Sequence, residues 1–137
     1  MTPPRFFFDR CCPVKIARVI QAFEEDHVVR YYSEDSRFQE NTDDVVWMKV
    51  LGDDKLNWVI LSMDGKILKR PHERQALLQS KLPYFLLGSA WMNMEMPERC
   101  WKLLKVWPEI VRTARETRHR IFEVKAGSSI KIEAVNL

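Results

Sequence analysis

The sequence predicts an α/β domain with a mostly parallel central sheet, covered by helices on both faces. Along most of the chain, short apolar runs alternate with segments whose apolar residues recur at helical spacing. Such alternation is typical of parallel strands joined by crossover helices. Near the end, two alternating segments flank Gly127-Ser128-Ser129, which predicts a C-terminal β-hairpin.

The composition indicates one soluble domain. The chain has 137 residues, so we expect residues 1–137 to form a single domain. The apolar fraction is 46% and the charged fraction is 30%, as in globular proteins. The net charge of +3 permits a nucleic-acid partner but does not require one. No signal segment opens the chain and no apolar run approaches the ~20 residues of a membrane span, so we expect no membrane contact.

The three cysteines, Cys11, Cys12 and Cys100, do not suggest a disulfide framework. Their number is odd, and adjacent cysteines seldom form a structural disulfide. There is no CxxC pair for zinc. A reducing cytoplasm therefore fits the cysteine usage best.

The first half of the chain is expected to contain two strands and two helices. Phe6–Phe8 resembles a short buried strand, and a helix follows over residues 13–23, where proline is tolerated in the first turn. The β-branched and aromatic segment His27–Tyr32 predicts a second strand. Thr42 is expected to cap a helix that runs to about Leu51.

The second half adds a strand, a basic loop, a helix, another strand, a long helix and the hairpin. These are expected at Asn57–Ser62, 63–70, Pro71–Ser80, Tyr84–Leu87, 96–117, and Ile121–Ala126 with Ile130–Val135. Pro108 lies inside the long helical pattern. Because proline lacks a backbone N–H, the pattern predicts either a kinked helix or two short ones.

Three aspartates are the candidate chemical groups. Asp9 ends the first apolar run, Asp64 follows the third predicted strand, and Asp44 opens the second helix. The carboxyl ends of parallel strands are where open α/β sheets place their sites. Gathered carboxylates repel one another, and hard oxygen ligands suit Mg²⁺ or Mn²⁺. The pattern therefore predicts a divalent-metal site.

Most of these acids also have a structural explanation when taken singly. Asp43 and Asp44 would favour the positive end of a helix dipole, and Asp43 could equally be the ligand. Asp64-Gly65 is a common turn pair. Glu40 could add a ligand or be solvated in its loop. Asp9 is the hardest to explain without a site.

Basic residues gather after the third aspartate. They are Lys66, Lys69, Arg70 and Arg74. They could be a solvated surface, or they could bind the nucleic-acid backbone. A bound metal lowers the pKa of its water and neutralises phosphate charge, so metal and bases together favour a phosphodiesterase.

At these residues the chain resembles a PIN-like domain of the VapC toxin type. The matching segments are Phe6–Asp9 with Pro13, Thr42-x-Asp44-x-x-Trp47, Val59–Asp64, Pro71-x-Glu73-Arg74 and Trp107–Ile110. They are spread over nearly the whole chain. The resemblance implies a three-layer α/β/α fold and a single PIN-like domain.

The resemblance also implies a function. It implies a Mg²⁺- or Mn²⁺-dependent endoribonuclease toxin, with Asp9, Asp44 and Asp64 as catalytic metal ligands and RNA as substrate. A cognate protein antitoxin would neutralise it. Similar proteins commonly dimerise, which admits a homodimer. A fourth acid is usual in the family, with Asp43 and Glu40 as candidates here.

The chain departs from the family pattern directly after Asp9, where Arg10, Cys11 and Cys12 follow. An inward-pointing Arg10 would compete with metal for the carboxylates. The alternative is therefore a catalytically degenerate PIN-like module that acts through RNA or antitoxin contact. A phosphotransfer domain ranks last, because position 11 lacks the second aspartate that such sites use.

Overall fold

The computed structural model describes residues 2–117 and 120–137. Its six strands are β1 Arg5–Phe8, β2 Val29–Tyr31, β3 Trp58–Ser62, β4 Tyr84–Leu87, β5 Ile121–Ala126 and β6 Ile130–Val135. They form one sheet in the order β2-β1-β3-β4-β5-β6. The pairs from β2 to β5 are parallel and the β5–β6 pair is an antiparallel hairpin. The predicted fold class is confirmed.

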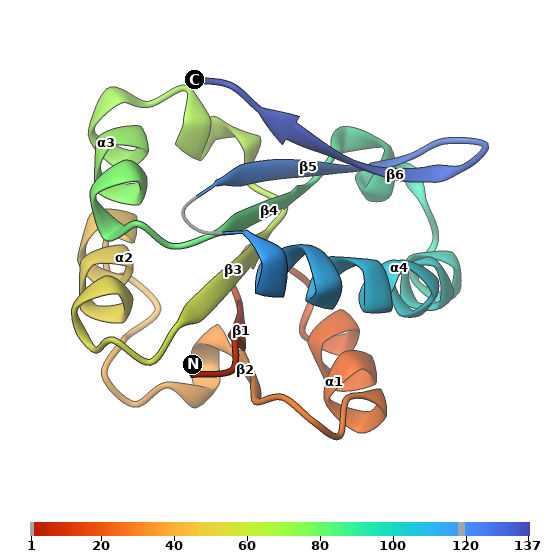
Figure 1. The fold of residues 1–137 in the computed structure, drawn as a ribbon, viewed down its shortest axis with the longest axis horizontal. Helices are drawn as coiled ribbons and strands as arrows, with labels where there is room; N and C mark the ends of the chain where they lie inside the picture. Colours follow the sequence, from red (N-terminus) through yellow and green to blue (C-terminus); the bar gives the residue numbers. More distant parts are fainter. Residues whose placement is uncertain (1, 118–119) are drawn as a thin grey trace.

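Four α-helices cover the sheet. They are α1 Val14–Phe23, α2 Asp44–Asp53, α3 Pro71–Ser80 and α4 Met96–Glu116. Figure 1 shows α2 and α3 on one side of the sheet and α1 and α4 on the other. Three short 3₁₀ segments, η1 Tyr32–Glu34, η2 Gly65–Leu68 and η3 Ser89–Asn93, lie in the connections.

Each face of the sheet has its own apolar core. Phe6, Phe8 and Leu61 pack with α1 and α4, whereas Phe7 and Ile60 pack with α2 and α3. This division follows from the alternation of side chains along a strand. Because both faces are covered, the central strands are almost entirely apolar and their ends are left for polar groups.

Several local predictions need correction. The second strand is shorter than His27–Tyr32, because the chain turns into η1 at Tyr32. Thr42 does not cap α2: Asp43 holds the N-cap position, and the Thr42 hydroxyl accepts the Gln39 N–H at 2.8 Å. The loop 63–70 contains a 3₁₀ turn, η2.

The alternative of two short helices around Pro108 is wrong. Helix α4 is continuous from Met96 to Glu116 with the proline inside it. The neighbours Trp107, Ile110 and Val111 are buried against the sheet, and this packing stabilises the helix where one backbone hydrogen bond is missing. Within the described residues, no helix combines the length and the apolar character needed to cross a membrane.

Candidate metal centre

Asp9 lies at the carboxyl edge of the sheet, between the ends of β2 and β3. It follows β1 directly, and its N–H donates to the Leu61 carbonyl of β3 at 2.9 Å. The register pairs Phe8 with Leu61, so the next residues, Asp9 and Ser62, lie side by side. Only 2% of Asp9 is exposed. The strand ending therefore places a carboxylate in a nearly dry position.

The two carboxylate oxygens of Asp9 are in different environments. Oδ2 accepts hydrogen bonds from the Ser62 hydroxyl at 3.1 Å and the Cys11 thiol at 3.4 Å. Oδ1 is buried and has no hydrogen-bond partner among the described residues. Burial first, and then the negative charge of Asp44, raise the pKa of Asp9 from 3.8 to about 6. An unpaired buried carboxylate is costly, and a bound cation would remove that cost.

Asp44 is the first residue of α2 and is close enough to influence Asp9. Its Oδ1 accepts the Trp47 indole N–H at 2.8 Å and the Arg10 guanidinium at 3.1 Å. The spacing of three residues places Asp44 and Trp47 on the same side of the first helical turn. This contact gives the Thr-x-Asp-x-x-Trp segment a structural role, which is to orient the aspartate.

Arg10 points into the site. Its guanidinium donates to the Tyr32 hydroxyl at 2.9 Å and to the Glu40 carbonyl at 2.8 Å, in addition to Asp44. It also lies 4.9 Å from the centroid of the Tyr32 ring. The side chain is therefore held on several sides. It supplies a positive charge at Asp44, so Arg10 has the inward direction that the sequence analysis considered.

Asp64 hydrogen-bonds the local backbone. Its Oδ1 accepts the Lys66 N–H at 3.0 Å and so caps η2, which is the turn role open to an Asp-Gly pair. Its N–H donates to the Ser62 hydroxyl at 3.0 Å, and its carbonyl accepts the Tyr84 hydroxyl at 3.2 Å. Burial, and then the charges of Asp9 and Asp64 among others, raise the pKa of Tyr84. Both carboxylates therefore lie near one phenol.

The fit of these residues to a metal is uneven. In the part of the chain that the structure describes, no three His, Cys, Asp or Glu side chains gather closely enough to form a ligand set. Asp9 fits a cation, because one of its buried oxygens has no other partner. Asp43 is exposed at the N-cap of α2, and Glu40 contacts the site through its carbonyl rather than its carboxylate.

Sequence reasoning missed three residues of the site. The sequence places Ser62 only at the end of a predicted strand, whereas its hydroxyl links Asp9 to the Asp64 backbone. Tyr32 and Tyr84 contact the site through their hydroxyls. The strand register was the available signal for Ser62. No sequence signal indicated the two tyrosines, because aromatic residues in strands are expected to lie in the core.

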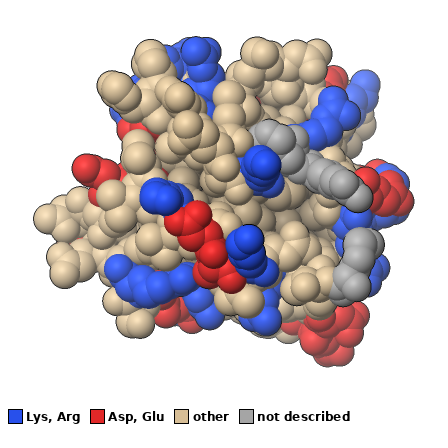
Figure 2. Space-filling model, turned by 60° about the vertical axis from the view of Figure 1, so that its left-hand side comes forward, with Lys and Arg blue, Asp and Glu red and all other residues tan. Residues whose placement is uncertain are grey.

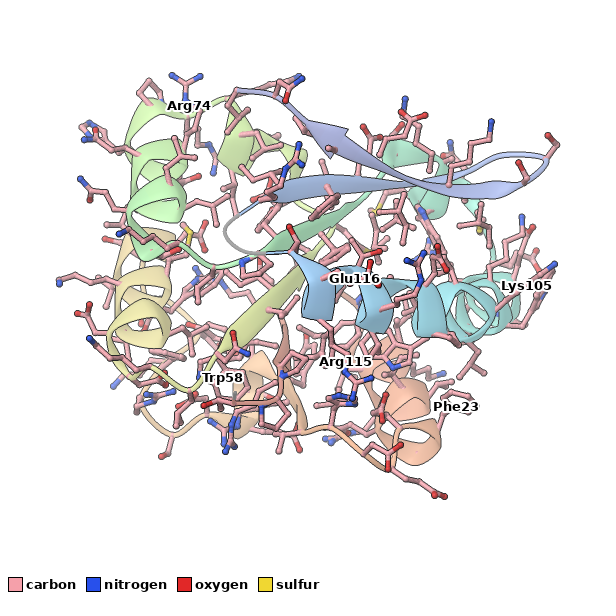
Figure 3. The ribbon with its side chains drawn as sticks, in the orientation of Figure 1. Phe23, Trp58, Arg74, Lys105, Arg115 and Glu116 are labelled. Atoms are coloured by element: carbon pink, nitrogen blue, oxygen red, sulfur yellow. The ribbon has the colours of Figure 1, made fainter. Side chains whose placement is uncertain are left out.

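The basic residues after Asp64 lie on the surface around η2 and α3. Lys66 and Lys69 are exposed, and Arg70 forms an ion pair with Glu73 at 3.1 Å. Figure 3 shows Arg74 on α3, across the sheet from Lys105 on α4. In Figure 2, basic side chains are interspersed with acidic ones on the face shown. On this face, therefore, the positive charge is distributed rather than gathered in one patch.

The family model described as a PIN-like domain matches residues 4–89, which is more than half of the chain. The matched segment contains β1 to β4 and with them Asp9, Asp44 and Asp64. Fold and match together define the class, and the chain belongs to the PIN-like domain family. No curated protein and no solved structure matches the chain significantly.

Proposed function

We propose that the protein is a metal-dependent endoribonuclease, the toxin of a toxin–antitoxin pair. The observation that carries the proposal is the buried Asp9 carboxylate with one unpaired oxygen at the carboxyl edge of the sheet. Membership of the PIN-like family supports a nuclease type of fold. The resemblance to the VapC type supports the toxin role.

Different residues of the chain would bind Mg²⁺ or Mn²⁺, orient the metal ligand and bind the RNA. Asp9 would hold the cation, with Asp44 and Asp64 as the further acids of the centre and Ser62 orienting Asp9. A cation bound there would lower the pKa of a water and neutralise charge on a phosphate. Lys66 and Lys69, together with Arg70 and Arg74, would bind the RNA backbone near that edge.

The remaining parts of the proposal concern partners. A toxin of this type would meet a cognate protein antitoxin and RNA in the cytoplasm, and a homodimer is compatible with the fold. The resemblance to the VapC type supports these partners.

A specific observation favours the second candidate, a degenerate module that binds without cutting. Arg10 already pairs with Asp44 at 3.1 Å and is further held by Tyr32 and Glu40. A resident guanidinium at one of the acids lowers the attraction of the site for metal. RNA binding without cleavage would support this candidate.

The test is cleavage of structured RNA by the purified chain with Mn²⁺, Mg²⁺ or EDTA. Asp9→Asn should abolish cutting, because it keeps the shape of the side chain and removes its charge. The matched control is Asp53→Asn, at an exposed acid that pairs with Lys49 on the surface of α2. Cutting that survives both EDTA and Asp9→Asn would refute a metal-dependent nuclease at this site.

A further inference from the structure

We infer that strand β6 is an interaction surface for a second copy of this chain, and that two β6 strands pair antiparallel across a twofold axis at Ile132. The inference assigns a surface to the homodimer named in the proposed function. It does not depend on nuclease activity, because it rests on the sheet edge and its charges alone.

Strand β6 lies at one end of the sheet and forms its upper border in Figure 1. It pairs with β5 on one side, and none of the described strands lies on its other side. About half of its backbone N–H and C=O groups are therefore directed away from the sheet, where they can pair with another strand. The opposite edge is a poorer template, because β2 has only three residues before the chain turns into η1.

Like charges face each other within the β5–β6 hairpin. The register pairs Lys125 with Lys131 and Glu123 with Glu133, and directly opposed like charges are unfavourable. A diagonal ion pair between Lys125 and Glu133, at 2.9 Å, relieves part of this repulsion. Lys131 is exposed and forms no ion pair with the residues that the structure describes. The outer strand therefore carries a cation that its own hairpin does not neutralise.

An antiparallel copy of β6 supplies the acid that Lys131 lacks. When Ile132 lies opposite Ile132 of the second copy, Lys131 lies opposite Glu133 of that copy, and the twofold axis repeats the pair. A shift of the second strand by two residues places Lys131 opposite Lys131 in one direction, and Glu133 opposite Glu133 in the other. The charges therefore favour one self-complementary register.

The other face of β6 fits the same register. Ile130 and Ile132 are half-buried and pack against the core on the side of α1 and α4. In this register Ile132 meets its own copy, and Ile130 lies opposite the exposed Ala134. Pairing therefore buries apolar surface on one face and pairs charges on the other. Because a six-residue edge is small for a protein interface, we expect a dimer of modest affinity.

The experiment is sedimentation equilibrium of the full chain at a series of concentrations. We expect a monomer–dimer equilibrium in the wild type. Lys131→Glu and Glu133→Lys each place like charges opposite one another twice, so each should raise the dissociation constant of the dimer by at least about tenfold. The matched control is Lys15→Glu, which makes the same charge change at an exposed position of α1 and should leave the constant unchanged.

The double variant Lys131→Glu/Glu133→Lys is the decisive one. It exchanges the two charges, restores opposite pairs across the axis, and should bring the dissociation constant back to near the wild-type value. It also places an acid opposite Lys125 and a base opposite Glu123 within the hairpin, so the fold should be retained. Circular dichroism verifies that each variant is folded.

Amide hydrogen exchange gives a readout that does not depend on charge. The β6 amides directed away from β5 should exchange slowly where the dimer forms and rapidly in dilute solution. A wild type that stays monomeric at its highest soluble concentration would overturn the inference, as would a dimer that tolerates both single reversals. Failure of the folded double variant to recover would reject the register. Since these measurements contain neither RNA nor metal, any of these failures leaves the nuclease proposal standing.

Discussion

Two buried aspartates, Asp9 and Asp35, have opposite surroundings. Asp35 is 4% exposed and accepts hydrogen bonds from Arg37 at 2.7 and 2.9 Å and from Arg30 at 3.1 Å. These contacts lower the pKa of Asp35 to about 2. Asp9 is 2% exposed, has one oxygen without a hydrogen-bond partner among the described residues, and has a pKa raised to about 6.

The difference indicates separate roles for the two acids. The charge of Asp35 is paired by Arg30 and Arg37. Arg37 also pairs with Asp54 at 3.1 Å and so ties the loop after η1 to the end of α2. The charge of Asp9 is not paired by the arginine that follows it, because the Arg10 guanidinium is directed to Asp44. A buried acid that pairs with no cationic side chain among the described residues is a candidate for a ligand, whereas one that arginines pair fully is structural.

The largest expected effect is the loss of stability when Asp35 loses its charge and its arginine ion pairs. Asp35→Asn should lower the free energy of unfolding by about 2–3 kcal/mol at pH 7. This loss is smaller than that expected for breaking a fully buried ion pair, because Arg30 and Arg37 are about one-third exposed to solvent. Urea denaturation measures this loss. Because the folded pKa of Asp35 is depressed, its contribution is present above the unfolded value near 4 and declines as pH falls toward about 2.

Asp53→Asn is the control, since both partners of the Asp53–Lys49 pair are well exposed and such pairs contribute about 0.5 kcal/mol or less. Equal stability of Asp35→Asn and wild type at pH 7 would show that the arginine contacts do not outweigh the cost of burial.

The next effect has the opposite sign. Asp9→Asn should raise the free energy of unfolding by about 1–3 kcal/mol at pH 8, since each unit of pKa shift corresponds to about 1.4 kcal/mol. The folded pKa is raised from 3.8 to about 6, so the native state binds the proton more tightly. Wild-type stability therefore falls as pH rises through this window. Thermal unfolding at a series of pH values measures it.

The advantage of Asp9→Asn should vanish below about pH 4, where the wild-type carboxyl is protonated both folded and unfolded. Cys100→Ser, a thiol change away from the site, provides a baseline for the pH series. A variant that is less stable than wild type at pH 8 would mean that the Asp9 carboxylate is stabilised in the fold, contrary to the comparison.

A smaller effect concerns metal binding at Asp9. Arg10→Met keeps most of the apolar stem and removes the charge beside Asp44. Mn²⁺ binding should become about fivefold tighter, which corresponds to the ~1 kcal/mol expected of a partly exposed ion pair. Isothermal titration calorimetry would detect the change.

Arg18→Met is the control, because Arg18 forms an ion pair of similar length, though more exposed, with Glu34 at 3.0 Å outside the site. Weaker Mn²⁺ binding by Arg10→Met would reverse the assignment. Arg10 would then orient Asp44 for the metal instead of competing with it.

The same contrast explains how much of the fold and site the sequence could predict. Asp9 was identifiable because a charge that ends a run of three phenylalanines has few structural explanations. The side chain of Arg10 has several rotatable bonds, so its direction depended on Tyr32 and Glu40, which come from other elements. Asp35 went unnoticed, because a polar loop gives no indication that two arginines will bury it.

The smallest effect tests the surface that would bring RNA to Asp9. Lys66→Ala should lower the slope of log K against log salt concentration by about 1, as expected for the loss of one phosphate contact. Arg70→Ala should change it less, since Glu73 already neutralises part of that charge. Lys105→Ala on α4, across the sheet from α3, is the control (Figure 3). Fluorescence anisotropy with a short RNA measures the slopes. If Lys105→Ala changes the slope as much as Lys66→Ala, then RNA binds the dispersed positive charge of the whole surface, and its approach is not directed to the edge that holds Asp9.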